Sequence, residues 1–88
     1  MTIVELATII GSHLVLGVSK QWTCHLRDVE EKDGPILTSR SGIGHTAREA
    51  IVDYVGFIRG KHIVIYSGNK DMRKEFDVPD TLEAGDLQ

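Results

Sequence analysis

The sequence predicts a single α+β domain in which one or two helices pack on one face of an antiparallel sheet, in the order α-β-β-β-α-β. Three observations lead to this fold class. The 88 residues are enough for one domain with one small core. Two segments combine a Thr-x-x-Glu cap with helical apolar spacing, and the segments between them alternate as strands do. We expect the domain to span residues 1–79, followed by a flexible acidic tail at residues 80–88.

The first helix is expected at residues 2–10, with an edge strand as the alternative. Thr2 followed by Glu5 is a capping-box pattern, and apolar residues then recur at spacings of three and four. Gly11 is a natural helix end. The many β-branched residues of this stretch favour a strand instead, so both possibilities stay open.

Three strands are expected to follow as an antiparallel meander. Alternation of apolar and polar residues at 13–20 and 22–29 predicts the first two strands. The Asp-Gly dipeptide at 33–34 predicts a turn into the third strand, at 36–42. The charged stretch 27–33 is most simply a solvated hairpin tip.

The second helix is expected to begin at Thr46, because Thr46 and Glu49 form another capping box ahead of an apolar helical stripe that Gly60 ends. Gly42 and Gly44 precede it, and we expect them to let the chain turn sharply, where φ can be positive. A nucleotide site is a weak alternative, since the spacing of dinucleotide-binding and phosphate-binding loops is missing.

The end of the chain is expected to add a fourth strand at 62–68, a charged loop at 69–75 and a short extended piece. The last residues, 80–88, contain three acids and two leucines. This is too little apolar surface to offset the entropy of ordering them.

Charge and cysteine content restrict the function. The net charge is −3: residues 1–74 carry ten bases and eight acids, whereas residues 75–88 carry five acids and no base. A broad nucleic-acid footprint normally needs a basic domain, so this balance disfavours one. A single cysteine, an apolar start without a basic region and the lack of a long apolar run predict a soluble cytoplasmic protein that does not enter a membrane.

No catalytic or metal-binding pattern stands out. Cys24 and His25 are neighbours on a strand and point to opposite faces, so they cannot share a tetrahedral metal site. Strand parity places Cys24 on the core face with Trp22 and Leu26, where a thiol is usually inert. We therefore expect no metal, no cofactor and no enzymatic activity.

The outward side of the meander is the candidate surface for a partner. Sheets that face solvent on one side are common binding platforms, although an ordinary polar sheet face is the simpler alternative. The candidate partner-binding residues are Thr23, His25, Arg27, Arg40, His45 and Arg48.

Two known domains share parts of this pattern. The α-β-β-β-α order with a Gly-x-Gly-x-Thr entry to the second helix, over residues 2–59, resembles the double-stranded-RNA-binding domain. In that family the start of the second helix is lysine-rich, whereas here Glu49 and Asp53 flank Arg48, so the resemblance implies topology rather than RNA binding. The string "GHTAREA" at residues 44–50 resembles the HicB-type antitoxin domain and implies a strand-to-helix packing unit.

A set of motifs runs through much of the chain: Trp22, "L-x-x-V-E-x-K-D-G" at 26–34, "G-x-G-x-T-x-x-E-A-I-x-D-Y" at 42–54, "I-x-G-K-x-I-V" at 58–64 and "R-x-E-x-x-V-P" at 73–79. In this combination the chain resembles small proteins of bacteriophages and prophages, which is the broadest of the three resemblances. It implies an accessory protein in the bacterial cytoplasm that binds a host or phage protein, with nucleic-acid binding as the alternative.

Overall fold

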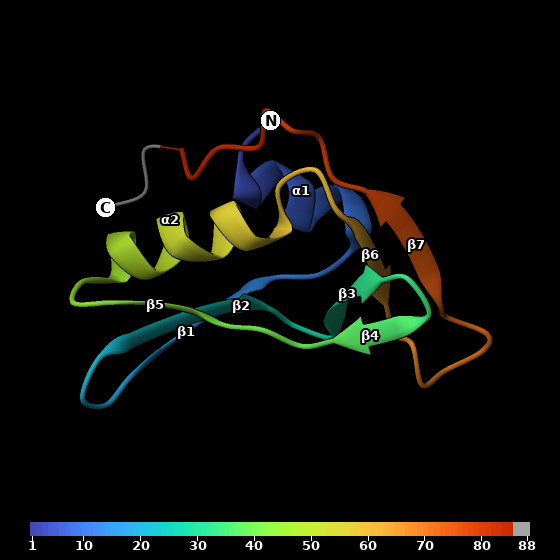
Figure 1. Cartoon of the computed structure of the whole chain (residues 1–88), viewed down its shortest axis with the longest axis horizontal. Helices are drawn as coiled ribbons and strands as arrows, with labels where there is room; N and C mark the ends of the chain where they lie inside the picture. Colours follow the sequence, from blue (N-terminus) through green and yellow to red (C-terminus); the bar gives the residue numbers. More distant parts are fainter. Residues whose placement is uncertain (86–88) are drawn as a thin grey trace.

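The computed structural model describes residues 1–85 and has the predicted α+β class, with two helices on one side of two antiparallel sheets (Figure 1). Among these residues, neither helix is long and apolar enough to cross a membrane. The elements are α1 (Ile3–Ile10), β1 (Leu14–Val18), β2 (Trp22–Leu26), β3 (Val29–Asp33), β4 (Ile36–Thr38), β5 (Gly42–Gly44), α2 (Ala47–Ile58), β6 (His62–Ile65) and β7 (Lys74–Asp77).

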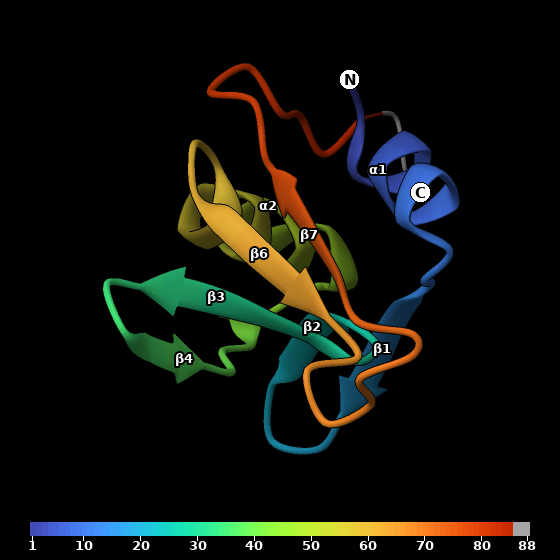
Figure 2. The ribbon, with the colours of Figure 1, turned by 90° about the vertical axis from the view of Figure 1, so that its right-hand side faces the viewer.

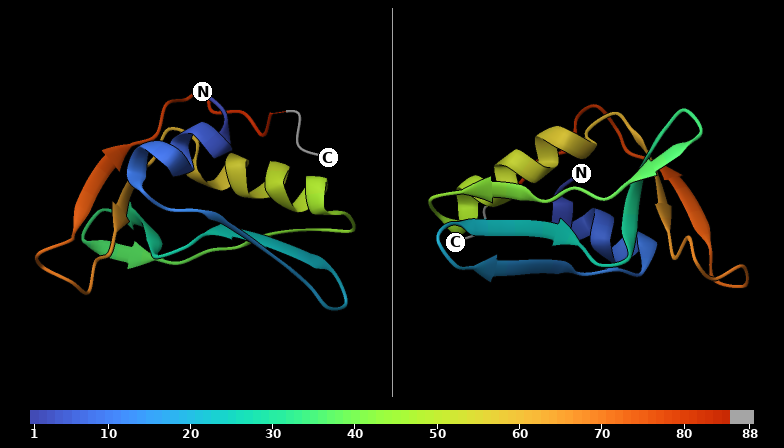
Figure 3. Two further views of the ribbon diagram at one scale, coloured as in Figure 1. Left: turned by 180° about the vertical axis from the view of Figure 1, so that it is seen from behind. Right: turned by 60° about the horizontal axis from the view of Figure 1, so that its bottom comes forward.

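The strands form two sheets instead of the single expected sheet, in the orders β1-β2-β5 and β4-β3-β6-β7. The segment 27–33, expected as a solvated hairpin tip, contains the interior strand β3. Val29 and Glu31 of β3 are buried because they lie on the face of the strand that is turned to the core, and β6 and β4 pair with its two edges. Figure 3 (right) shows β3 leaving the end of β2 at a sharp angle, which separates the two sheets.

The third expected strand, at 36–42, is divided between the sheets. β4 pairs with β3, and β5 pairs with β2. The chain therefore crosses from one sheet to the other at residues 39–41, and the β1-β2-β5 part of the predicted meander is retained. In Figure 2, β3, β6 and β7 lie beside one another while β1 and β2 lie apart from them.

The first element is a helix and not an edge strand. Both halves of its capping box form, with Glu5 N–H donating to the Thr2 hydroxyl and Thr2 N–H donating to the Glu5 carboxylate. Gly11 ends the helix in the left-handed conformation, at φ 71°. One face is buried through Ile3, Leu6, Ala7 and Ile10, so burial of this face outweighs the β-branched propensity.

Gly42 and Gly44 serve a different purpose from the expected turn. Neither has a positive φ; both lie in β5, directly against α2. A Cβ at Gly42 would come within 2.2 Å of the Ala50 carbonyl oxygen, and one at Gly44 within 2.5 Å of the Glu49 Cβ. The two glycines therefore allow a strand and a helix to approach more closely than any side chain permits.

The prediction of a flexible tail is wrong for residues 80–85, because this segment packs against the domain. Leu82 is fully buried in the core cluster, and the Arg59 guanidinium donates to its carbonyl oxygen at 2.7 and 3.0 Å. Glu83 pairs with the N-terminus, since Ile3 N–H donates to the Glu83 carbonyl at 2.8 Å. The domain thus extends to at least Gly85, and residues 86–88 lie outside the described part of the chain.

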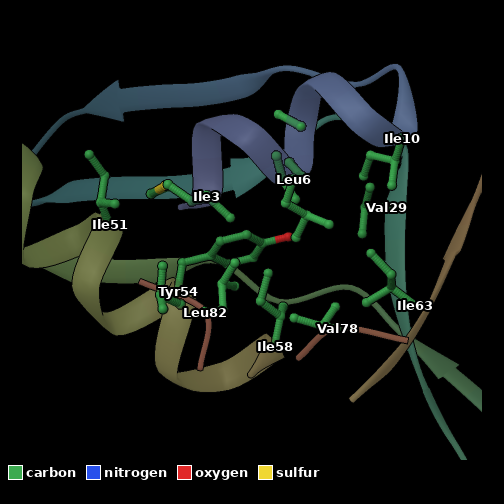
Figure 4. Packing of buried hydrophobic residues seen from close by; sticks show 14 of the residues in the cluster. Ile3, Leu6, Ile10, Val29, Ile51, Tyr54, Ile58, Ile63, Val78 and Leu82 are labelled. Atoms are coloured by element: carbon green, nitrogen blue, oxygen red, sulfur yellow. The ribbon is translucent and has the colours of Figure 1, made fainter. Parts of the chain in front are cut away.

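The core lies between the helices and the inner faces of both sheets. The Tyr54 ring occupies its middle, with residues of α1 on one side and Leu82 and Ile58 on the other (Figure 4). Cys24 and Leu26 point inward from β2, which confirms the core face assigned to this strand. Their neighbours Thr23 and His25 consequently point away from the helices.

Candidate functional site

The six candidate partner-binding residues are only partly brought together. Thr23 and His25 lie on the outward face of β2, and the Arg27 guanidinium lies just beyond this strand, 3.6 Å from the Asp28 carboxylate. His45 is exposed in the turn before α2. Of the six candidates, only Thr23 and His25 therefore lie together on the outward face of the sheet, as predicted.

The two other arginines are held elsewhere. The Arg40 guanidinium lies 4.8 Å from the centre of the Phe57 ring of α2, a cation–π contact on the helix side of the molecule. Arg48 donates to the Gly85 carbonyl at 2.9 Å, so it lies against the C-terminal segment. Neither contributes to the outward face of β2, and the six residues do not form one continuous basic patch.

Two of the six residues line cavities: Arg48 borders a smaller one beside the C-terminal segment, and His25 borders a larger one. This cavity, of about 540 Å³, opens at the corner where the end of β2, the start of β3 and the turn after β6 meet. It lies on the side of the sheets away from the helices, because His25 and Glu30 both point outward. Its polar lining comes from His25, Asp28, Glu30, Ser39, Ser67 and Asn69, and Tyr66 adds an aromatic ring.

The backbone of this cavity is strained at two points. Asp28 has a φ of 60° and Tyr66 a φ of 56°, and they are the non-glycine residues with positive φ in the described part of the chain. Each costs about 1 kcal/mol or more. Tyr66 N–H donates to the Asp28 carbonyl at 2.9 Å, so the two strained residues are joined. Asp28 tolerates this conformation, but nothing in the sequence marks Tyr66 for it.

The charge of the cavity is negative. Asp28 and Glu30 contribute two carboxylates, and no lysine or arginine is present among the described lining residues. The Ser67 hydroxyl donates to the Glu30 carboxylate, which fixes the position of this half-buried acid. The adjoining turn is closed by Asn69 N–H, which donates to the Tyr66 carbonyl at 3.0 Å. The sequence interpretation missed this cavity because its residues come from three distant segments.

A second polar cluster lies on β6 and β7, in the β4-β3-β6-β7 sheet. The two ring nitrogens of His62 lie 2.6 Å from Asp77 and 2.6 Å from Glu75. Hydrogen bonds to Asp77 and then to Glu75 raise the pKa of His62, and the same contact lowers the pKa of Glu75. Because both nitrogens face carboxylates, the imidazolium form can donate to both and so link β6 to β7.

Within residues 1–85, no three His, Cys, Asp or Glu side chains are arranged to hold a metal ion. Cys24 is also unsuited to nucleophilic chemistry. Burial raises the pKa of its thiol to about 11, so the thiolate is scarce at neutral pH.

The N-terminus of α2 is closed to anions by its own side chains. Ile43 N–H donates to the Asp53 carboxylate at 2.9 Å, and His45 N–H donates to the Glu49 carboxylate at 3.0 Å. Glu49 N–H is taken by the Thr46 hydroxyl. The glycine-spaced turn at 41–46 therefore starts a helix, and its amide groups point at carboxylates that would repel a phosphate.

The core also contains an ionisable pair that no motif predicted. Glu31 is only 3% exposed, and its carboxylate oxygens have no hydrogen-bond partner within residues 1–85. Burial raises its pKa, although nearby backbone groups and the charges of Lys61 and Arg40 oppose this. Burial likewise raises the pKa of the Tyr54 hydroxyl, and the Glu31 charge adds to the effect.

Replacing Glu31 with glutamine is expected to raise the free energy of unfolding at neutral pH by about 1 to 3 kcal/mol, because the neutral amide avoids the cost of burying a carboxylate charge without a hydrogen-bond partner. A carboxyl whose pKa is raised in the folded state contributes its full stability below the unfolded pKa and loses it as pH rises through the folded pKa. The two proteins should therefore match below about pH 4 and diverge towards neutral pH in urea titrations. The exposed change Asp33→Asn serves as control, and a difference independent of pH would contradict the expectation.

Comparisons of the chain with protein-family models, with curated proteins and with solved structures find no match. The class that the structure defines is an α+β protein with two sheets, a layer of two helices on one side of them and an acidic cavity at the outward corner between the sheets.

Proposed function

We propose that this protein is a non-catalytic module that binds another protein through the outward corner between its sheets. The observation that carries the proposal is the corner cavity, which places His25 and Glu30 at the ends of well-paired strands and Asp28 in the two-residue turn that joins them. Residues on strand ends are positioned more rigidly than residues on free loops. A rigid polar depression of this kind supports recognition of a partner surface.

The charge distribution favours a protein partner over a nucleic acid. Nucleic-acid binding relies on several lysines and arginines that contact phosphates from one surface. Here Arg40 packs on Phe57 and Arg48 binds the Gly85 carbonyl, while the cavity between the sheets is acidic. A phosphate backbone would be repelled at the corner. Nucleic-acid binding is the alternative that the experiment below decides.

The biological setting we propose rests on the sequence resemblance to phage and prophage proteins. On that basis the module acts in the cytoplasm of a bacterial host, and its partner is a host or phage protein. The buried thiol of Cys24, with its raised pKa, supports a binding role over a catalytic one because it removes the most reactive nucleophile of the chain.

The test is a comparison of immobilised wild-type protein with Glu30→Gln and with Asp33→Asn in a bacterial lysate. Glu30→Gln removes a cavity charge and keeps the acceptor for Ser67, whereas Asp33→Asn makes the same charge change at the far, exposed end of β3. We expect a protein that wild type and Asp33→Asn retain and that Glu30→Gln loses. In parallel, DNA and RNA binding that weakens steeply with salt and is unaffected by Glu30→Gln would overturn the proposal in favour of the nucleic-acid alternative.

A further inference from the structure

We propose that the corner cavity receives a basic side chain, an arginine or a lysine, from the partner. This inference rests on the proposed function and names the group that the site recognises. Asp28 and Glu30 supply two negative charges, and the described residues that line the cavity supply no fixed positive charge in return. A charged hydrogen bond to a guanidinium or an ammonium group is the contact that such an environment favours.

The apolar part of the cavity fits the stem of the same side chain. Tyr66 is only partly buried and adds an aromatic ring to the lining, whereas Leu26 and Val29 belong to the core and expose little surface to the cavity. Arginine and lysine bury their methylene stems on apolar surface while the charged head stays with polar partners. An aromatic ring beside two carboxylates matches this division.

The polar rim provides further acceptors for the N–H groups of the head. Ser39 adds a hydroxyl to the two carboxylates, and Asn69 adds an amide oxygen that already accepts from Asp71 N–H and has one lone pair left. A guanidinium has five N–H donors and an ammonium has three, and neither accepts a hydrogen bond. A lining rich in oxygen acceptors is therefore suited to either group.

The chain itself already places a guanidinium at the edge of this site. Arg27 lies 3.6 Å from the Asp28 carboxylate, with both side chains about half exposed or more. Exposed pairs of this kind contribute little stability, so an incoming cation can replace Arg27 at small cost. The strained residues Asp28 and Tyr66 are tied together by a hydrogen bond, which keeps the acceptors in place before the ligand arrives.

The test uses small probes and backbone amide signals in ¹H–¹⁵N NMR spectra at neutral pH. N-acetyl-arginine amide and N-acetyl-lysine amide supply the two cations, and the neutral N-acetyl-citrulline amide is the matched control. We expect at least one cationic probe to shift the amides of residues 25–30 and 66–69, and citrulline to leave them unchanged. Glu30→Gln should weaken this binding about tenfold, whereas Asp33→Asn should not alter it.

Four results would overturn the proposal: no binding of either cationic probe, equal shifts with citrulline, equal affinity in Glu30→Gln, or shifts of the same amides by inorganic phosphate. The outcome is separable from that of the proposed function. If Glu30→Gln loses a protein partner but neither cationic probe binds, the module binds protein through other groups and the cationic assignment alone is wrong. If a probe binds but no protein is retained, the cation site stands and the protein-binding function is wrong.

Discussion

Replacing Gly42 with alanine is expected to lower the free energy of unfolding by about 3 kcal/mol, the upper range for overpacking a well-packed site. The new Cβ would lie 2.2 Å from the Ala50 carbonyl oxygen and 2.4 Å from the Tyr54 nitrogen. Both are backbone atoms of α2, so no side-chain rotation can relieve the clash. The strand and the helix must move apart, and the core around Tyr54 opens. Urea unfolding followed by circular dichroism measures the loss.

The matched control is Gly56→Ala, on the exposed side of the same helix. A Cβ there meets nothing within 4 Å, and alanine has the higher helix propensity. This change is expected to stabilise the protein by about 0.5 to 1 kcal/mol. If Gly42→Ala and Gly56→Ala changed stability in the same direction, the close approach of β5 and α2 would be contradicted.

Replacing Leu82 with alanine is expected to cost about 2 to 5 kcal/mol, as for other buried leucines. Leu82 is fully buried in the core cluster with Ile3 and Ile58. The Arg59 guanidinium donates a hydrogen bond to its carbonyl oxygen. The lost side chain would leave a cavity between the helices. In a domain of this size each kcal/mol lowers the melting temperature by about 4 to 8 °C, so thermal unfolding shows the effect clearly.

Its control is Thr81→Ala, the exposed neighbouring residue, which is expected to change stability by less than about 0.5 kcal/mol. Equal melting temperatures for the two variants would show that the C-terminal segment is not part of the core. Such a result would support the sequence-based prediction that residues 80–88 form a flexible tail.

Local signals in the sequence were sufficient to predict where both helices begin and which face of β2 is buried. The Thr2–Glu5 and Thr46–Glu49 caps lie at the observed helix starts, because a cap depends on residues three apart in the chain. Gly11 and Gly60 follow the two helices with positive φ. The alternation that placed Cys24 and Leu26 inward also held, since side chains of a strand alternate wherever one face is buried.

Other features depend on contacts between distant segments, and no local pattern reports them. The charged stretch around Glu31 was predicted to be a solvated hairpin tip. In the structure it pairs with β6, a distant segment of the chain, and becomes an interior strand of the sheet. The roles of Gly42 and Leu82 follow from which backbone lies opposite each residue. The candidate cavity follows from the hydrogen bond that joins Asp28 to Tyr66 just beyond the β3–β6 pairing. Helix caps, strand parity and fold class are thus encoded in short-range spacing. The pairing of β3, the packed C-terminus and the acidic corner arise because burial and hydrogen bonding are satisfied over the whole chain at once.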